Sequence, residues 1–146
     1  MSSYISAALR RHVAERADYL CEYCLIAEVD TFFGCEVDHV ISEKHGGDTM
    51  SGNLAYACAF CNRHKGSDIG SIDPEYEAFT RFYHPRRDRW SEHFALSGAE
   101  IKPLTAVGAA TVRILRMNAT ERLLERTALQ QAGRYPSTAA RERTER

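Results

Sequence analysis

Two C-x-x-C pairs are the feature that most constrains how this chain folds. Cys21 and Cys24 form the first pair, and Cys58 and Cys61 form the second. Zinc prefers four thiolates arranged as a tetrahedron, and each short turn places two sulfurs on the same side of the ion. A redox dithiol needs only one such pair. The sequence therefore predicts a structural zinc site held by all four cysteines.

The distance between the two pairs indicates a folded insertion. Thirty-three residues separate Cys24 from Cys58, whereas the usual gap in a zinc ribbon is roughly 15–20 residues. The fifth cysteine, Cys35, lies inside this insertion and is expected to be a small buried apolar residue.

Composition fits a globular protein without a membrane segment. The chain has 146 residues, of which 44% are hydrophobic and 27% are charged, and its formal net charge is −1. Any binding of nucleic acid must therefore come from a local basic face. No apolar run of about 18 residues is present, so no membrane span is expected. The first residues lack an apolar signal core, which favours a cytoplasmic protein. In the cytoplasm, five cysteines favour metal binding or free thiols over disulfides.

The N-terminal half contains a recognisable order of elements. Apolar spacing over 5–20 predicts a helix that Ser6 caps and that leads to Cys21. The segment 31–41 is rich in Phe and Val and predicts a strand, 42–53 predicts a loop, and 54–58 predicts a return strand. A short helix is expected to begin within the second cysteine pair and to end at Gly66.

The C-terminal half is expected to add a hairpin and helices. Residues 78–84 resemble a strand, and 93–104 predict a hairpin around Ser97 and Gly98. Two helices are expected over 105–118 and 119–133, with Thr105 and Asn118 as caps. The last segment, 134–146, is predicted to be a disordered tail.

Four motifs, "CEYC", "EVDHVISEKHGG", "GNL" and "CAFCNRHKGSD", span 21–68 and include both cysteine pairs. Together they resemble the HNH endonuclease family in its variant with a four-cysteine zinc knuckle. The resemblance implies an α+β fold with a ββα-metal (His-Me finger) core. We accordingly expect an N-terminal helix over 1–20, a nuclease core with the zinc knuckle over 21–68, a strand, hairpin and two-helix extension over 69–133, and the tail.

The resemblance also implies roles for individual residues. In this family the histidine that follows the aspartate is the general base, which is His39 here. The aspartate and the residue after the last cysteine bind a divalent cation, which gives Asp38 and Asn62. Asn53 matches the asparagine that braces the loop and so orients the base.

His64 offers an alternative third residue, because His39, Asn53 and His64 also spell H-N-H. At about 100° per residue, His64 lies roughly 200° around a helix from Asn62, so both cannot face one small site. Lys65 lies about 60° around the helix from Asn62, so these two side chains can face the same site. The amide oxygen of Asn62 suits a hard cation, which favours Mg²⁺ or Mn²⁺ over a second tightly bound Zn²⁺.

These residue types suit hydrolysis of a phosphodiester. A neutral imidazole can take a proton from water near neutral pH, and a divalent cation can stabilise charge on the phosphate and on the leaving oxygen. Adjacent residues of a strand point to opposite faces. We therefore expect irregular backbone at Asp38 and His39, so that both reach one site.

The expected activity is metal-dependent cleavage of DNA by an endonuclease. Lys65, Arg86, Arg87 and Arg89 are candidates for contacts with the nucleic-acid backbone. Two alternatives stay open, namely a zinc-knuckle module that binds without catalysis and an RNA-cleaving nuclease of the same fold. Sequence specificity and oligomeric state, monomer or homodimer, are not indicated.

Overall fold

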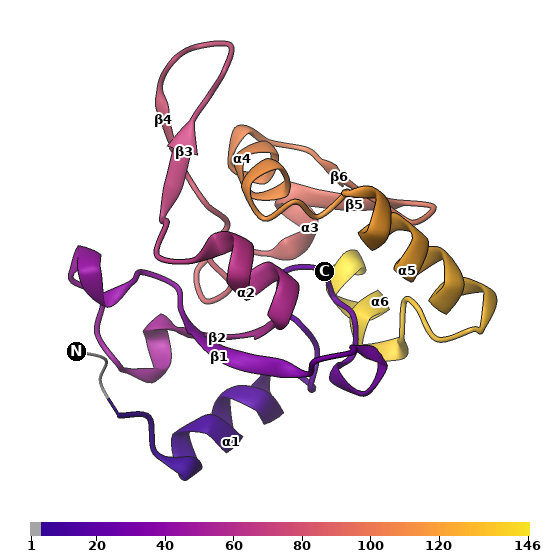
Figure 1. Ribbon diagram of the computed structural model, residues 1–146, viewed down its shortest axis with the longest axis horizontal. Helices are drawn as coiled ribbons and strands as arrows, with labels where there is room; N and C mark the ends of the chain where they lie inside the picture. Colours follow the sequence, from indigo (N-terminus) through magenta and orange to yellow (C-terminus); the bar gives the residue numbers. More distant parts are fainter. Residues whose placement is uncertain (1–3) are drawn as a thin grey trace.

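The protein is a small mixed α/β domain, described here from a computed structural model that covers 4–146 (Figure 1). In chain order the elements are α1 (Ala7–Arg16), η1 (Glu28–Asp30), β1 (Cys35–His39), η2 (Glu43–His45), η3 (Ser51–Asn53), β2 (Leu54–Cys58), α2 (Ala59–Lys65), β3 (Gly70–Ile72), β4 (Phe79–Arg81), α3 (Trp90–His93), β5 (Phe94–Ser97), β6 (Glu100–Pro103), α4 (Ala106–Ile114), α5 (Thr120–Gln131) and α6 (Thr138–Glu145). Three two-stranded antiparallel sheets pair β1 with β2, β3 with β4 and β5 with β6.

The β1–β2 hairpin lies between α1 and α2 (Figure 1). Its register runs from Cys35 opposite Cys58 to His39 opposite Leu54. One face packs on α1, where Val13, Ala14 and Leu54 belong to a buried apolar cluster. Pairing is regular through His39, so the irregular backbone predicted at this position is absent from the ladder.

The N-terminal helix is shorter than predicted. Ser6 caps it by accepting a hydrogen bond from the Leu9 N–H at 3.1 Å, as expected. The helix ends at Arg16, because Asp18 and Tyr19 adopt the left-handed conformation with φ of 54° and 57°. This turn redirects the chain so that Leu20 bridges to Ala27, with the first cysteine pair in the bend between them.

The C-terminal half contains the predicted hairpin but only one of the two predicted helix caps. The predicted hairpin is β5–β6, and Thr105 caps α4 through the Gly108 N–H. Asn118 does not cap α5, because its side-chain amide instead bonds both backbone groups of Ile101.

The predicted disordered tail is wrong. Residues 138–145 form α6, and Ser137 caps its first turn by accepting a hydrogen bond from the Ala140 N–H. Ala140 and Tyr135 are buried, and the Tyr135 hydroxyl donates to the Cys24 carbonyl at 2.8 Å. The polar composition of the segment concealed these few buried contacts.

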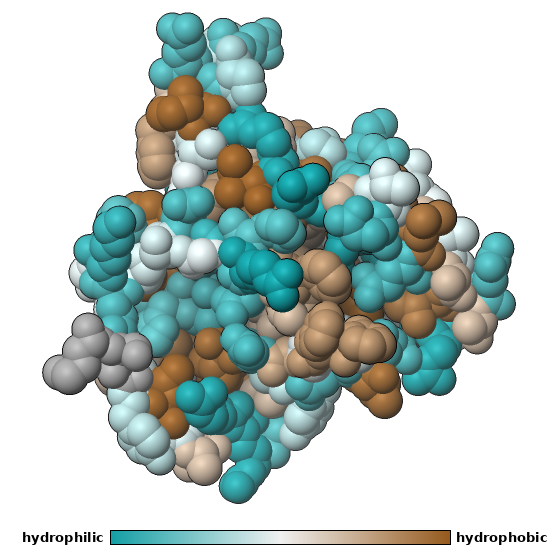
Figure 2. Space-filling model, viewed as in Figure 1, coloured by the Kyte–Doolittle hydropathy of each residue, from teal (hydrophilic) through white to brown (hydrophobic). Residues whose placement is uncertain are grey.

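The β3–β4 hairpin projects from the body (Figure 1). It carries exposed apolar side chains at Ile72, Tyr76 and Phe79, and hydrophobic surface is visible on it in Figure 2.

Among residues 4–146, no helix is long and apolar enough to cross a membrane.

Candidate active site and metal centre

The four paired cysteines converge on one point. The sulfurs of Cys21, Cys24, Cys58 and Cys61 all lie within 4.8 Å of one another, and all four residues are buried. The Cys24 and Cys58 sulfurs are 3.8 Å apart. A tetrahedron with Zn–S bonds of about 2.3 Å has sulfur–sulfur edges of about 3.8 Å, so the cluster fits a structural zinc. Cys35 is half-buried and lies outside the cluster.

A buried arginine from α5 contacts this cluster. Arg122 donates to the Cys24 sulfur at 3.0 Å and to the Cys58 sulfur at 3.6 Å. Its guanidinium also lies 4.9 Å from the centre of the Phe60 ring. Hydrogen bonds from the neighbouring thiols, and then the charge of Arg122, lower the pKa of Cys58. Four thiolates around Zn²⁺ carry a net charge of −2, which this cation partly balances.

Asp38 lies on the side of β1 that faces α2. Its carboxylate accepts from Lys65 Nζ at 3.2 Å and from the Tyr23 hydroxyl at 3.1 Å. Burial raises the pKa of Asp38, and the charge and hydrogen bonds of Lys65, followed by the bond from Tyr23, oppose that rise.

Lys65 was expected from the sequence to contact phosphate, but the structure buries it. Only 1% of its side chain is exposed, and its ammonium also donates to the His39 carbonyl at 2.9 Å. The ammonium therefore anchors the end of α2 to β1. The helical angle correctly predicted the side of α2 that Lys65 faces, but it carried no information about burial.

Asn62 faces a carboxylate that the sequence analysis did not single out. The Asn62 side-chain amide donates to Glu36 Oε2 at 2.8 Å at the protein surface. Glu36 stands two positions before Asp38 in a regular strand, so both point to the same face. The strand period was the signal that could have identified Glu36. Glu36, Asp38 and Asn62 thus lie along one face of the hairpin–helix unit and offer oxygen donors, which suit a hard divalent cation.

His39 closes β1 and contacts the loop that follows. Its Nε2 lies 3.0 Å from the Thr49 hydroxyl and 3.3 Å from Glu43 Oε1. The side chain is 18% exposed. Thr49 and Glu43 therefore hold the imidazole orientation, and neither was identified from the sequence.

Asn53 ties the two ends of this loop together. Its side-chain oxygen accepts from the Ile41 N–H at 2.9 Å, and its amide donates to the Ile41 and Asp48 carbonyls. A Cβ on Gly47 would lie 1.7 Å from the Ile41 oxygen, so only glycine fits this approach. These contacts fix the loop immediately after His39.

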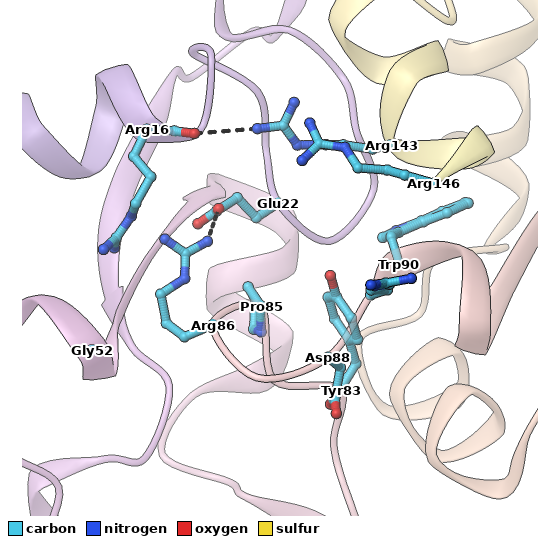
Figure 3. Close-up of a pocket in the computed structure, with 11 residues that line it drawn as sticks. Arg16, Glu22, Gly52, Tyr83, Pro85, Arg86, Asp88, Trp90, Arg143 and Arg146 are labelled. Carbon is cyan, nitrogen blue, oxygen red and sulfur yellow. Dashed lines mark hydrogen bonds and ion pairs between the residues drawn. The ribbon is translucent and has the colours of Figure 1, made fainter.

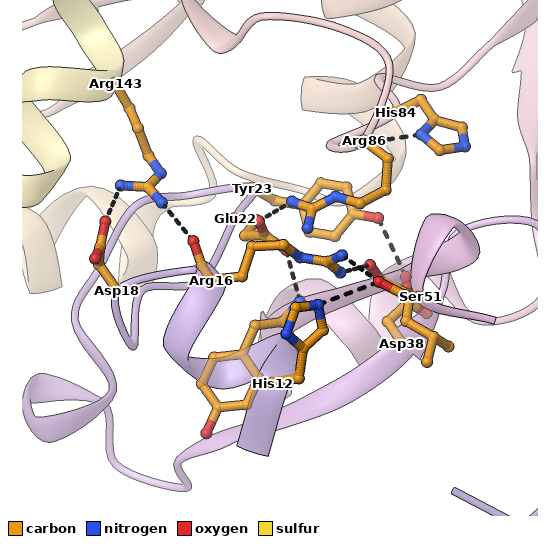
Figure 4. A network of polar contacts seen from close by, with 12 residues as sticks. His12, Arg16, Asp18, Glu22, Tyr23, Asp38, Ser51, His84, Arg86 and Arg143 are labelled. Atoms are coloured by element: carbon orange, nitrogen blue, oxygen red, sulfur yellow. Dashed lines mark hydrogen bonds and ion pairs between the residues drawn. The ribbon is translucent and has the colours of Figure 1, made fainter. Parts of the chain in front are cut away.

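A polar network supports the same region from α1 (Figure 4). Arg16 donates to the Ser51 hydroxyl at 2.7 Å and to the Leu54 carbonyl at 2.8 Å, so it holds the chain on both sides of Asn53. Arg86 forms an ion pair with Glu22. Burial raises the pKa of Glu22, and the positive charge of Arg86 opposes this rise.

The three arginines predicted to bind nucleic acid line two separate hollows. Arg86 is largely buried, with 14% of its side chain exposed. Arg87 lines a hollow over the loop segment 41–53, together with Gly47 and Asn53. Arg86 and Arg89 line another cavity, beside α6.

The fold and the cysteine cluster together define a small mixed α/β domain with a four-cysteine metal-binding centre. Residues 21–68 match the family model of the HNH endonuclease domain, which confirms the resemblance seen in the sequence. The matched segment contains all four zinc-candidate cysteines and Asp38, His39, Asn53 and Asn62. No curated protein matches the chain.

Proposed function

We propose that the protein is a metal-dependent endonuclease that hydrolyses phosphodiester bonds in DNA. The observation that carries the proposal is the arrangement around β1 within the matched segment. Carboxylates and an amide line the face toward α2, while an oriented imidazole closes the strand. The oxygen donors suit a divalent cation, and the imidazole suits a general base.

In this proposal His39 takes the proton from the attacking water. Thr49 and Glu43 hold the ring in place, and Asn53 fixes the loop that carries both of them. A rigid support of this kind improves catalysis by keeping the base close to the reactive geometry.

The divalent cation, Mg²⁺ or Mn²⁺, is proposed to bind on the face of β1 toward α2. Asp38 and Asn62 are its proposed ligands, and Glu36 is a further one because it already contacts the Asn62 amide. When bound, the cation supplies positive charge to the phosphate and to the leaving oxygen. Lys65 holds the Asp38 carboxylate in place.

The proposed zinc has a structural role. A hairpin and one short helix are too few residues to form a sufficient core alone, and the cluster joins the bend at Cys21 to the start of α2. Zinc binding then contributes directly to folding.

The test is nicking of supercoiled plasmid in Mg²⁺ or Mn²⁺ by wild-type protein, His39→Ala and His64→Ala. We expect His39→Ala to abolish nicking and His64→Ala to retain it, because His64 lies outside the proposed site. If wild type and His39→Ala leave the plasmid equally intact in every metal, the protein is a binding module. Faster cleavage of RNA than of DNA at the same site would replace the proposed substrate.

A further inference from the structure

A cavity of about 500 Å³ lies where α1, the turn before α3 and α6 meet (Figure 3). Its lining contains five arginines and two carboxylates, which leaves three positive charges unbalanced. The arginines are Arg16, Arg86, Arg89, Arg143 and Arg146, and the acids are Glu22 and Asp88.

Ion pairs with residues outside the cavity do not remove this excess. Arg143 pairs with Asp18, and Asp88 pairs with Arg81. Adding these two partners contributes one charge of each sign, so the excess stays at three. The whole protein has a formal net charge of −1, so the cavity concentrates positive charge on a molecule that is otherwise slightly acidic.

Two of these arginines also carry unsatisfied donors. The Nε atoms of Arg16 and Arg86 are buried, and among the described residues 4–146 they have no hydrogen-bond partner. A buried donor without an acceptor destabilises the folded protein. Arginine is the side chain best suited to phosphate oxygens, because its guanidinium presents several donors in one plane.

The cavity adjoins the proposed catalytic loop. Gly52 lines both this cavity and the hollow that Gly47, Asn53 and Arg87 also line. Arg16 lines the cavity and bonds Ser51 and Leu54 on either side of Asn53. A nucleic-acid strand that passes over this loop would therefore reach the arginines of the adjoining cavity.

We propose that this arginine cavity binds a backbone phosphate of the nucleic-acid substrate, flanking the bond that is cleaved. The inference rests on the proposed function, because it takes the position of the scissile phosphate from the His39 loop. Continuity with that loop favours a polymer over a free anion. Contacts of this kind position the backbone without reading its sequence.

Arg89 and Arg146 are suitable residues for the test. Both are exposed, and within 4–146 neither side chain forms a hydrogen bond or ion pair with the protein. The test variant is Arg89→Gln/Arg146→Gln in a His39→Ala background. Its matched control is Arg11→Gln/Arg141→Gln, which removes two exposed arginines from α1 and α6 that do not line the cavity. The two double variants have the same net charge.

Binding of a fluorescent DNA duplex is measured by anisotropy on zinc-loaded protein across a salt titration. We expect the cavity variant to bind on the order of tenfold more weakly than the control. The plot of log K against log salt has a negative slope, and we expect the magnitude of that slope to decrease by about 1 to 2 in the cavity variant. Equal affinities and slopes for the two variants would overturn the inference while leaving plasmid nicking, and so the proposed function, intact.

A second measurement does not depend on the variants. The Nε–Hε resonances of Arg16 and Arg86 are followed by NMR as duplex or inorganic phosphate is added. Shifts with duplex at concentrations far below those needed with phosphate support a backbone site. Shifts with phosphate alone show a small-anion site instead, and no shift with either probe overturns the inference.

Discussion

Lys65 Nζ lies 3.2 Å from Asp38 Oδ2 and 3.3 Å from Oδ1, and both side chains are almost completely buried. The pair joins the last turn of α2 to the final residues of β1. Tyr23, which lies between the first two cysteines, donates to the same carboxylate. The ion pair therefore links the metal-binding knuckle to the proposed catalytic strand.

Removing one partner of this pair should strongly destabilise the protein. We expect Lys65→Met to lower the free energy of unfolding by about 3–5 kcal/mol, because it leaves a buried carboxylate without its counter-charge. The measurement is denaturant unfolding in zinc-saturated buffer.

The double variant Asp38→Asn/Lys65→Met provides the control. It removes both charges, so it should recover a large part of the lost stability although it lacks the proposed metal ligand. A Lys65→Met protein as stable as wild type would show that the pair contributes nothing to folding.

Arg122 should strengthen zinc retention. Substitution of a residue that contacts metal ligands typically costs about 10–100-fold in metal affinity. We expect Arg122→Gln to lose zinc to a chromogenic chelator at correspondingly lower chelator concentration, because both sulfur contacts and their positive charge are removed.

Arg122→Lys separates charge from geometry. It keeps the positive charge but loses the planar guanidinium, whose Nη2 reaches both sulfurs, so its zinc retention should fall between those of wild type and Arg122→Gln. If all three proteins release zinc at the same chelator concentration, the contacts do not stabilise the metal.

Local patterns carried most of what could be predicted from the sequence. The cysteine spacing and the glycine that ends α2 act over a few residues, so the zinc cluster and the order of β1, β2 and α2 were predictable. Alternation along β1 also contained Glu36, although the family motif drew attention to its neighbours instead.

Contacts between distant segments could not be predicted. Arg122 lies 98 residues after Cys24 and meets its sulfur only after α5 has packed on the knuckle. The folded tail likewise depends on Tyr135 reaching the Cys24 carbonyl. The burial of Lys65 follows from the length of its side chain and the closeness of β1, and neither produces a sequence pattern.

His84 should make stability depend on pH. It is buried, and its Nδ1 accepts the Arg86 N–H at 3.2 Å. Burial, and then the charge of Arg87, lower the pKa of His84 below 6.5. The unfolded chain therefore binds this proton more readily than the folded protein, so the folded state loses stability as the pH falls below 6.5 until it too is protonated.

The comparison is between wild type and His84→Asn, whose side-chain oxygen can accept the same N–H. Thermal unfolding at about pH 7.5 and about pH 5.5 should show wild type losing stability relative to the variant, by at most about 1.4 kcal/mol per pH unit. A stability difference that is the same at both values would contradict the expected titration.

Glu36 should determine how much divalent metal the proposed reaction requires. Its carboxylate is exposed and bonds the Asn62 amide at 2.8 Å. Glu36→Gln keeps the size of the side chain but removes a negative charge beside the proposed ligands, so we expect a several-fold increase in the Mg²⁺ or Mn²⁺ concentration that gives half-maximal nicking. The thermal midpoint in zinc should change little, because the side chain is exposed. Glu15→Gln is the charge-matched control on α1 and should keep the wild-type metal dependence. If Glu36→Gln has that same dependence, Glu36 is not a ligand and the proposed cation relies on Asp38 and Asn62.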